Sequence, residues 1–508
     1  MRHDVLIVGA GPTGLVLALW LTRQGVRVRV LDKAEGPGTT SRALAVQART
    51  LELYEQLDLT GAVLDGGHRI EGVNAWVQGK RRVRVPFGIV GQGLTPYPFL
   101  HIFPQDRHER LLVDRLHDLG VDVERRTEVL SFEERDDYIV ARYRHEDGGE
   151  ATCEASYIVG CDGARSMVRK GIGADFPGGT YRQLFYVADV EGRGAALDGE
   201  LHVDLDEADF VAIFGFGGGK GRLVGIVADD REEQDDTLRF DDVSGNAIAS
   251  LGVSIDKVNW FSTYRVHHRV ADRFRRGRAF IAGDAGHVHS PAGGQGMNTG
   301  IGDAINLAWK LAAVIRGDSD DALLDTYEAE RLPFARKLVK TTDKAFSVVT
   351  AEGRMADLIR TRLAPVLLGV VSHAAFVREF LFRTVSQTTL TYREGPLGGT
   401  RAGEVHAGDR LPWVRSDDGD NYHALRTIGW QVHVYGEPSA ALSAWCESRG
   451  LPLHAFRWTA AHADAGLACD AAYLLRPDTY VGAADAAGDP AVFDRCLARH
   501  GGRVGTAD

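Results

Sequence analysis

Near the amino end, the residues best suited to bind a cofactor are three glycines and one acid. Gly9, Gly11 and Gly14 form a Gly-x-Gly-x-x-Gly motif, and Asp32 ends the next apolar run. In such a motif the first glycine permits a tight turn, the second lets the backbone approach a pyrophosphate, and the third lets a helix pack closely on a strand. An acid at the position of Asp32 can bind a ribose hydroxyl, which argues mildly against a 2′-phosphate there. The motif predicts a dinucleotide site and leaves FAD and NAD both open.

A second stretch with binding chemistry covers residues 283–298. Gly283 and Asp284 open it, a segment rich in Gly and Pro follows, and a helical pattern starts near Asn298. Backbone N–H groups at a helix start are free and carry partial positive charge, so they attract an anion or the electron-rich edge of a ring. Taken alone, this stretch fits an ordinary strand-loop-helix corner equally well.

Hydrophobic periodicity identifies the elements that must position these residues. Apolar runs at residues 5–8 and 26–31 predict strands of a parallel sheet covered on both faces, with a helix over residues 15–23 between them. Residues 279–282 predict a further strand, and the helix after it has apolar residues at three- and four-residue spacings. Strand, glycines, helix, strand and acid in this order are much more specific than a lone glycine motif.

Length and composition limit the class of protein. A chain of 508 residues, at a prior of about 150 residues per domain, predicts two to four domains. Hydrophobic content of 44%, charged content of 25% and a net charge of -11 argue for a soluble globular protein that binds neither nucleic acid nor an anionic membrane. Five cysteines without a Cys-x-x-Cys pair indicate neither a disulfide framework nor a metal site, and no leader is visible, so a cytoplasmic location is expected. The apolar run at residues 363–377 is too short to span a bilayer and is interpreted as a packed helix pair.

Three further stretches complete a recognisable combination. Arg42 precedes one helical pattern, Gln105 opens another, and Asp162 follows an apolar strand in an Asp-Gly pair. With the glycine motif and Gly283-Asp284, this combination resembles the class A flavoprotein monooxygenases, the FAD-dependent aromatic hydroxylases related to p-hydroxybenzoate hydroxylase and phenol hydroxylase. The resemblance covers most of residues 1–345. It implies an α/β fold, with a Rossmann-like FAD-binding domain and an inserted, mainly antiparallel β-sheet domain for the substrate.

The resemblance also implies which residues contact FAD. The glycine motif would surround the pyrophosphate, Asp32 the adenosine ribose, and Asp284 a ribityl hydroxyl. Arg42 and Gln105 would touch the phosphates and the ribityl region, and Pro291 would edge the isoalloxazine. The implied set is Gly9, Gly11, Pro12, Thr13, Gly14, Asp32, Lys33, Arg42, Gln105, Asp162, Asp284, Pro291, Gly294, Gly296, Met297 and Asn298.

The substrate domain is predicted from alternating strand patterns over residues 178–276, with strands near residues 76–103 joining the same sheet. The stretch at 215–221 looks phosphate-binding, but no helix follows it, so a hairpin loop is expected. Alternation alone does not decide which side chains face a pocket, and the pattern favours a packing or surface role over a catalytic one for each candidate. The candidates are His101, His202, Phe210, Phe214 and His267, with Pro291 from the cofactor loop.

The carboxyl end starts with a Gly-rich boundary at residues 395–408. The strand-helix-strand order that follows, with Ala-Gly-Asp-Arg-Leu-Pro at 407–412 and Arg-Pro-Asp at 476–478, resembles the thioredoxin-like tail domain of the phenol hydroxylase branch. Without a Cys-x-x-Cys pair no disulfide exchange is expected, and a structural role, such as at a homodimer interface, is predicted. The predicted domain limits are 1–177, 178–276, 277–394 and 395–508.

The resemblance implies a reaction. NADPH or NADH would reduce FAD, O2 would add to give a flavin C4a-hydroperoxide, and one oxygen would pass to a phenolic or polycyclic aromatic substrate. No metal is required, because the flavin activates O2. Two alternatives stay open: a non-hydroxylating flavoprotein oxidoreductase of the same fold, and a non-catalytic FAD-binding redox sensor.

Overall fold

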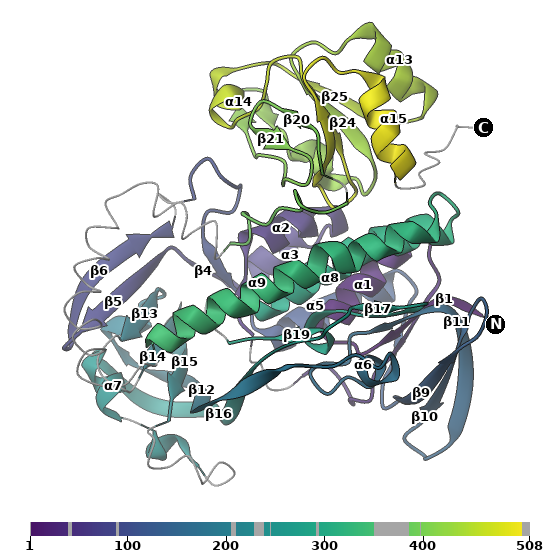
Figure 1. The fold of residues 1–508 in the computed structure, drawn as a ribbon. Coiled ribbons are helices and arrows are strands. Elements are labelled where there is room, and N and C mark those ends of the chain that lie inside the picture. Colours follow the sequence, from purple (N-terminus) through teal and green to yellow (C-terminus); the bar gives the residue numbers. More distant parts are fainter. Residues whose placement is uncertain are drawn as a thin grey trace.

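The computed structural model describes residues 2–38, 43–87, 91–204, 210–227, 238–243, 245–290, 294–349, 386–396 and 398–499. Figure 1 shows two large sheets side by side, with a carboxyl-terminal part above them. The predicted helix pair at residues 363–377 lies outside the described residues. Within them, no helix is long and apolar enough to cross a membrane.

The first sheet is built around parallel strands. Its order is β17 (Arg275–Arg276), β18 (Ala279–Ile281), β11 (Glu150–Gly160), β1 (His3–Val8), β2 (Val28–Leu31) and β8 (Val123–Glu124), while β10 (Ile139–Arg144) pairs with β11 and β9 (Glu128–Glu134) pairs with β10. The five strands from β18 to β8 run in one direction. Residues 5–8 of β1 are buried, as an apolar central strand requires when both faces of its sheet are covered.

Helices pack on this sheet as the periodicity predicts. α1 (Pro12–Arg23) contacts both α5 (Gln105–Asp118) and α8 (Gly296–Ile315). Residues 14–21 of α1 are all buried, which explains why this helix is apolar on every side. α9 (Asp325–Val349) contacts α8 and extends across the molecule to the second sheet (Figure 1).

The second sheet is antiparallel except at one pair of strands. Its order is β19 (His287–Val288), β16 (Val253–Val270), β12 (Gly178–Gly194), β15 (Lys220–Ile226), β14 (Val211–Gly217), β13 (Leu201–Asp204), β5 (Gly72–Val77) and β6 (Lys80–Pro86), with β13 and β5 parallel. β14 and β15 form the predicted hairpin, with positive φ angles at residues 217–219. Because β18 belongs to the first sheet and β19 to the second, the stretch that starts at Gly283 connects the two.

One predicted strand lies elsewhere. β5 and β6 join the second sheet, but β7 (Leu100–Ile102) pairs with β3 (Ala45–Val46) and β4 (His68–Ile70) in a separate three-stranded sheet. Glycines and prolines at positions 91, 93, 96 and 98 break the strand pattern between β6 and β7, so the chain leaves the large sheet there. The small sheet lies beside α2 (Ala48–Tyr54) and α3 (Thr60–Gly66) (Figure 1).

The carboxyl-terminal part has its own four-stranded sheet. Its order is β25 (Leu453–Phe456), β24 (Gln431–Tyr435), β26 (Ala472–Leu475) and β27 (Val481–Asp485), and only β24 and β25 are parallel. α13 (Ala440–Ser448) and α15 (Pro490–Arg499) pack on one face, and a second core fills the other. The elements lie where the sequence predicts them, while the thioredoxin-like relationship stays a prediction.

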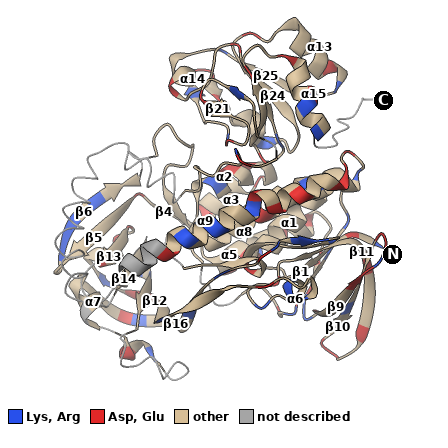
Figure 2. Ribbon diagram, viewed as in Figure 1, with Lys and Arg blue, Asp and Glu red and all other residues tan. Residues whose placement is uncertain are grey.

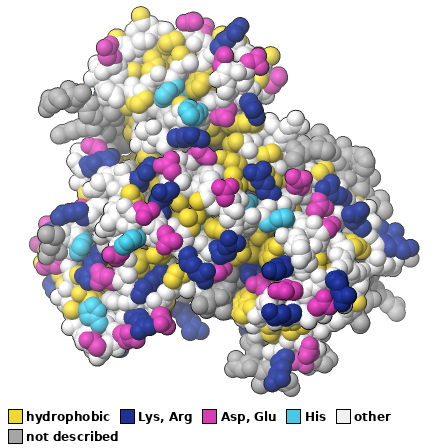
Figure 3. All heavy atoms as spheres, turned by 180° about the vertical axis from the view of Figure 1, so that it is seen from behind, with side chains coloured by type: hydrophobic (Ala, Val, Ile, Leu, Met, Phe, Trp, Pro, Cys, Tyr) yellow, Lys and Arg dark blue, Asp and Glu magenta, His cyan; other side chains and the backbone are white. Residues whose placement is uncertain are grey.

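Charged side chains of both signs are interspersed. Lys, Arg, Asp and Glu alternate along α9 in Figure 2, and basic and acidic side chains are mixed over the opposite face in Figure 3. This distribution is typical of a solvated surface.

Candidate active site

Four predicted motifs meet at one edge of the parallel sheet. In register, Leu31 of β2 pairs with Val8 of β1, Val8 with Gly160 of β11, and Gly160 with Ile281 of β18. The carboxyl ends of these strands therefore lie next to one another. The residues that follow them include four of the predicted cofactor set: Asp32, Gly9, Asp162 and Asp284. Ligands of open α/β sheets bind at this edge.

The three glycines of the first motif have different surroundings. Gly9 has φ +102°, and a Cβ there would overlap the carbonyl oxygen of Cys161. A Cβ on Gly14 would overlap the carbonyl oxygen of Gly9, which shows how closely α1 packs on β1. A Cβ on Gly11 would meet no heavy atom of the described residues within 4 Å. Gly11 thus faces open space at the start of α1, where a pyrophosphate fits.

Asp32 is fixed by the backbone around it. Its Oδ2 accepts from the N–H of Ala10 at 2.6 Å, and its Oδ1 accepts from the N–H of Ala34 at 2.7 Å. Arg125 Nη1 lies 3.4 Å from Oδ2. The carboxylate of Asp32 is therefore held against the glycine motif. The side chain of the next residue, Lys33, is exposed.

Thr13 connects the first motif to the second. A Cβ on Gly283, whose φ is +62°, would lie 2.6 Å from Thr13 Oγ1, and a Cβ on Gly300 would overlap the same atom. α1, the Gly283 turn and the first turn of α8 therefore contact one another at a single threonine side chain. Only glycine fits on either side of it.

Every hydrogen-bonding group of the Asn298 side chain has a partner within the protein. Its Nδ2 donates to the carbonyl oxygens of Ala45 at 2.8 Å and Gly294 at 3.1 Å. Its Oδ1 accepts from the N–H of Gln47 at 2.9 Å and from Thr50 Oγ1 at 2.7 Å. This side chain ties the start of α8 to β3 and α2, so only the backbone of Asn298 is left to reach a cofactor.

Gln105 lies at the start of α5 and is connected through Glu109 to Gly38. Its Nε2 donates to Glu109 Oε1 at 2.8 Å, and Glu109 Oε2 accepts from the N–H of Gly38 at 2.8 Å. Gln105 and Glu109 thus connect the start of α5 to the backbone of Gly38. Arg42 and Pro291 lie outside the described residues.

Asp162 and Arg169 connect the Asp-Gly turn to its surroundings. Asp162 Oδ2 accepts from the N–H groups of Met167 at 2.6 Å and Val168 at 3.2 Å, capping α6 (Met167–Gly171). Asp162 Oδ1 is buried and has no hydrogen-bond partner among the described residues. Arg169 Nη1 donates to the carbonyl oxygen of Ala285 at 2.9 Å, which joins this turn to the Gly283 turn.

His289 offers an unsatisfied acceptor near the start of α8. Its Nδ1 lies 2.8 Å from the carbonyl oxygen of Ser290, so Nδ1 carries the proton and Nε2 a lone pair. Nε2 is buried without a hydrogen-bond partner in the described part of the chain, 3.8 Å from the position of a Cβ on Gly296. Burial lowers the pKa of His289 to about 4, so the ring is neutral at pH 7. An acceptor in this position fits an N–H donor on a bound ring.

A buried acid that the sequence analysis missed supports the Gly283 turn from behind. Asp303 Oδ2 accepts from the N–H of Gly283 at 3.0 Å and lies 2.6 Å from His287 Nε2, and its Oδ1 accepts from Arg331 Nε at 2.6 Å. Burial alone would raise the pKa of Asp303, but Arg331 and His287 outweigh it and lower that pKa to about 2. Both Asp303 and Arg331 lie at polar positions of helices, and this was the only signal for them in the sequence.

The three candidate histidines make hydrogen bonds to neighbouring residues of the protein. His101 is buried, and its Nε2 donates to the carbonyl oxygen of Val63 at 2.7 Å. His202 accepts from Trp76 Nε1 at 2.9 Å through Nδ1 and lies 2.8 Å from an Asp198 carboxylate oxygen through Nε2. His267 is exposed and lies 2.7 Å from Thr180 Oγ1.

The two candidate phenylalanines share one face of the second sheet. Phe214 packs in a cluster with Leu44 and Ala45, next to the strand that Asn298 binds. Phe210 packs with Tyr264 on the same face, whereas the side chains of alternate residues, such as Ile213, pack on the other face with α7 (Gly245–Ser250). The structure thus brings Phe210 and Phe214 to the side where the cofactor motifs lie, together with Phe216, which the sequence analysis did not select.

Comparisons with known proteins identify the family. A family model described as an FAD binding domain matches residues 2–342. The chain is 38% identical over 425 residues to 6-methylpretetramide 4-monooxygenase of Streptomyces rimosus, an alignment that covers 82% of this chain and 75% of that protein.

The chain belongs to the class A flavoprotein monooxygenases. This monooxygenase is 34% identical to a flavin-dependent monooxygenase of Mycobacteroides abscessus, with 94% of this chain and 96% of that protein covered. Among solved structures it resembles the OxyS anhydrotetracycline hydroxylase from Streptomyces rimosus, with 28% identity, a TM-score of 0.78 and 99% of each chain covered. It is a flavin-dependent aromatic hydroxylase, with FAD as cofactor and NAD(P)H as the reductant typical of its family. The open space at Gly11 and the unsatisfied His289 acceptor fit FAD.

Proposed function

We propose that this monooxygenase hydroxylates a phenolic, polycyclic aromatic compound, with O2 and NADPH or NADH as co-substrates. The observation that carries the proposal is an aromatic face on the second sheet, formed by the half-buried side chains of Phe210, Phe214, Phe216 and Tyr264. Flat aromatic surfaces bind fused rings through offset or edge contacts. The names of two relatives, which specify 6-methylpretetramide and anhydrotetracycline, support the same substrate class.

The cofactor-binding residues belong to the proposal. The N–H groups around Gly11 bind the pyrophosphate of FAD, Asp32 binds the adenosine ribose, and Asp284, which is exposed at the Gly283 turn, binds the ribityl chain. The first turn of α8 presents its N–H groups to the pyrimidine edge of the flavin, where negative charge develops on reduction. When bound and reduced by NAD(P)H, FAD would supply the electrons that activate O2.

The residues of the chain then position the substrate and exclude water. The aromatic face holds the ring system by apolar contact. The first turn of α8, which Asn298 bonds to β3 and α2, forms the opposite wall of the substrate site. Water exclusion matters because the activated oxygen is otherwise lost without product. His101 is bonded to the carbonyl oxygen of Val63, and His202 to Trp76 and Asp198, so we assign substrate positioning to the aromatic face rather than to these histidines.

We also propose the domain limits 1–177, 178–276, 277–394 and 395–508. Three element boundaries support them: β12 starts at Gly178, β17 ends at Arg276, and β20 (Arg401–Ala402) is the first strand of the carboxyl-terminal part.

A cytoplasmic location is supported by the five unpaired cysteines, since a reducing compartment keeps thiols free. A homodimer is the remaining proposal, and sedimentation of the purified enzyme at several concentrations tests it.

A substrate panel tests the proposed function. Simple phenols and polycyclic phenols are compared for stimulated NAD(P)H oxidation, and products are checked for the mass of one added oxygen. We expect the highest kcat/KM for polycyclic phenols. Phe214→Ala should raise KM for these compounds about tenfold, the effect of losing one aromatic contact. Phe240→Ala is the matched control, because Phe240 packs with Phe261 on the α7 side. Exclusive turnover of simple phenols would refute the proposal.

A further inference from the structure

A buried turn of the carboxyl-terminal part contacts three helices of the FAD-binding part. Residues 476–479, called here the docking turn, connect β26 to β27 and are all buried. Thr479 has φ +67°, which is uncommon for a residue with a side chain. Turns at the end of a sheet usually lie on the surface, so complete burial of this one calls for a physical reason.

An enclosed group of charges binds the docking turn to α8 and α9. Arg476 Nη1 donates to Glu330 Oε1 at 2.7 Å, and Arg476 Nη2 donates to Asp478 Oδ2 at 2.6 Å. Lys310 Nζ donates to Glu330 Oε2 at 2.8 Å. All four side chains are at most 3% exposed, and their two positive and two negative charges balance.

The burial of these charges makes the group sensitive to the loss of one member. Burial lowers the pKa of Lys310 to about 8 against the opposing effect of Glu330. Burial would raise the pKa of Glu330, but Arg476 and Lys310 hold it well below its usual range. Removing one partner leaves a buried charge without compensation, which costs far more than an exposed ion pair.

The same turn is bound from the other side by α2. Arg49 Nη2 donates to the carbonyl oxygen of Asp478 at 2.9 Å and to Thr479 Oγ1 at 2.8 Å. Gln56 Nε2, just beyond α2, donates to the carbonyl oxygen of Pro477 at 2.8 Å. Trp309 Nε1 of α8 donates to Asp478 Oδ2 at 3.1 Å, so one turn receives hydrogen bonds from both helices.

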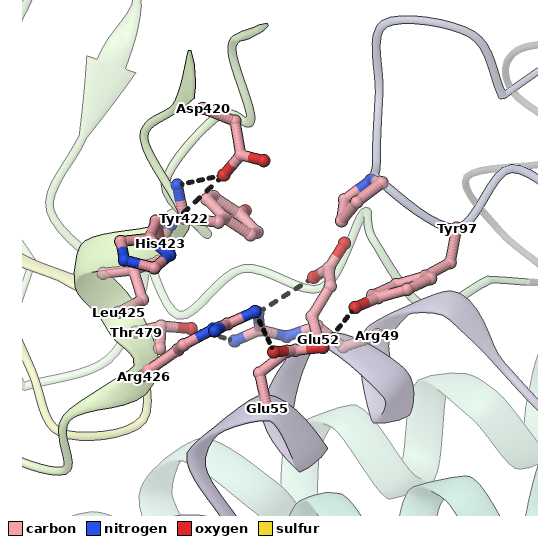
Figure 4. A pocket seen from close by; sticks show the side chains of 11 residues that line it. Arg49, Glu52, Glu55, Tyr97, Asp420, Tyr422, His423, Leu425, Arg426 and Thr479 are labelled. Carbon is pink, nitrogen blue, oxygen red and sulfur yellow. Dashed lines mark hydrogen bonds and ion pairs between the residues drawn. The ribbon is translucent and has the colours of Figure 1, made fainter. Parts of the chain in front are cut away.

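Figure 4 shows the neighbouring part of this interface. Side chains of α2 and the turn after it, including Arg49, Glu52 and Glu55, face Tyr422, Arg426 and Thr479 of the carboxyl-terminal part. They line a cavity of about 80 Å³ whose walls combine charged side chains with apolar ones. Glu52 also accepts from Arg410 Nε at 2.9 Å. Ion pairs of Arg410 with Glu52 and of Arg426 with Glu55 therefore add to the contacts of the docking turn on the α2 side.

The docking turn and Asn298 act on the same pair of helices. Asn298 joins the starts of α8 and α2, and the docking turn joins the two helices again at Trp309 and Arg49. At a rise of about 1.5 Å per residue, Trp309 lies roughly 16 Å along α8 from Asn298. The contacts of the docking turn therefore restrict the position of α8 relative to α2 at a second point, in addition to the packing of α8 on α1.

We propose that Arg476 and Asp478 of the docking turn are positioning residues for the FAD site, holding α8 so that its first turn stays against α2 and β3. The carboxyl-terminal part thereby controls the affinity of the enzyme for FAD without touching the cofactor. This inference rests on the proposed placement of FAD at the start of α8.

The test measures FAD affinity and local protection in the full-length chain. Arg476→Met should raise the dissociation constant for FAD about tenfold, the effect of one lost buried charge contact transmitted through α8. Hydrogen exchange of the amides at residues 297–301 in the apoprotein should accelerate by a similar factor. Arg476→Lys, which keeps the charge, should lie between the wild type and Arg476→Met.

Two further variants keep the test decisive. Arg449→Met is the matched control, because Arg449 forms a partly exposed ion pair with Asp494 in the same part of the chain. It should leave both readouts unchanged. If Arg476→Met does not fold, Trp309→Phe removes the hydrogen bond to Asp478 together with part of a buried ring. It should change both readouts in the same direction.

The inference is overturned if exchange accelerates only in residues 398–499 while FAD affinity and the protection of residues 297–301 stay at wild-type values. That pattern would assign the docking turn to domain attachment alone. Failure of the proposed substrate class is a separate outcome, since it changes product formation and leaves FAD affinity intact.

Discussion

The backbone N–H of Gln47 donates to Asn298 Oδ1 over 2.9 Å, although 251 positions separate the two residues in the chain. This bond joins the start of α2 to the start of α8 at the place where the predicted cofactor motifs gather. It also explains why the asparagine is needed there: one amide both accepts from and donates to backbone groups of different elements.

Replacing Asn298 should therefore affect stability and cofactor binding together. Asn298→Ala leaves the N–H of Gln47 and the carbonyl oxygen of Ala45 buried without this partner, at a cost of about 2–4 kcal/mol for two lost buried bonds. Urea unfolding of the apoprotein and titration with FAD measure the two effects. Asn259→Ala, at an exposed bond to Glu191, is the control and should change neither. A stable Asn298→Ala protein with normal FAD affinity would contradict this role.

The glycine motif predicts opposite behaviour at two of its positions. Gly11→Ala should leave the apoprotein as stable as the wild type, because the added methyl group meets no described atom, yet it should weaken FAD binding at least about tenfold by occupying the space of the pyrophosphate. Gly14→Ala should destabilise the apoprotein, since the methyl group overlaps the carbonyl oxygen of Gly9. Thermal melting with and without FAD separates the two cases. Equal losses of apoprotein stability in both variants would mean that Gly11 is a packing glycine.

His108 predicts a loss of stability in mild acid. Burial beside Tyr54 lowers the pKa of His108 to about 3, while an unfolded histidine has a pKa of about 6.5. The unfolded chain binds the proton first, so stability is complete above pH 6.5 and falls as the pH approaches 3. Between pH 6.5 and 5 this group removes up to about 2 kcal/mol from the free energy of unfolding.

Urea unfolding at pH 7.5 and pH 5 checks the effect of His108. His108→Leu should flatten the difference between the two conditions, because the titrating group is gone. Tyr54→Phe serves as the control, since it removes the hydrogen bond and keeps the titration. If both variants retain the wild-type difference, the acid sensitivity comes from another group.

The sequence predicted the elements around the cofactor well because their signals are local. The glycine motif, the strand before it and the acid after it lie within a single βαβ unit, and each has its own periodicity or turn chemistry. Contacts between distant segments had no such signal. Thr13 between Gly283 and Gly300, and Asp303 behind the Gly283 turn, become visible only when α1, α8 and α9 pack together.

Two residues show where local interpretation fails. Lys310 near the end of a helix pattern is consistent with a surface cation that complements the helix dipole, but the structure buries it against Glu330. His202 alternates as a pocket residue would, yet Trp76 and Asp198 occupy both of its ring nitrogens. In both cases the deciding partner lies on another element, and neither spacing nor residue type reveals it.

The most direct test of the proposed function is turnover of a polycyclic phenol under oxygen-18 gas. The reduced enzyme should give a product that is heavier by one oxygen atom and carries the isotope, with one NAD(P)H consumed per product when turnover is fully coupled. NAD(P)H oxidation without such a product, or a product whose new oxygen comes from water, would contradict the account.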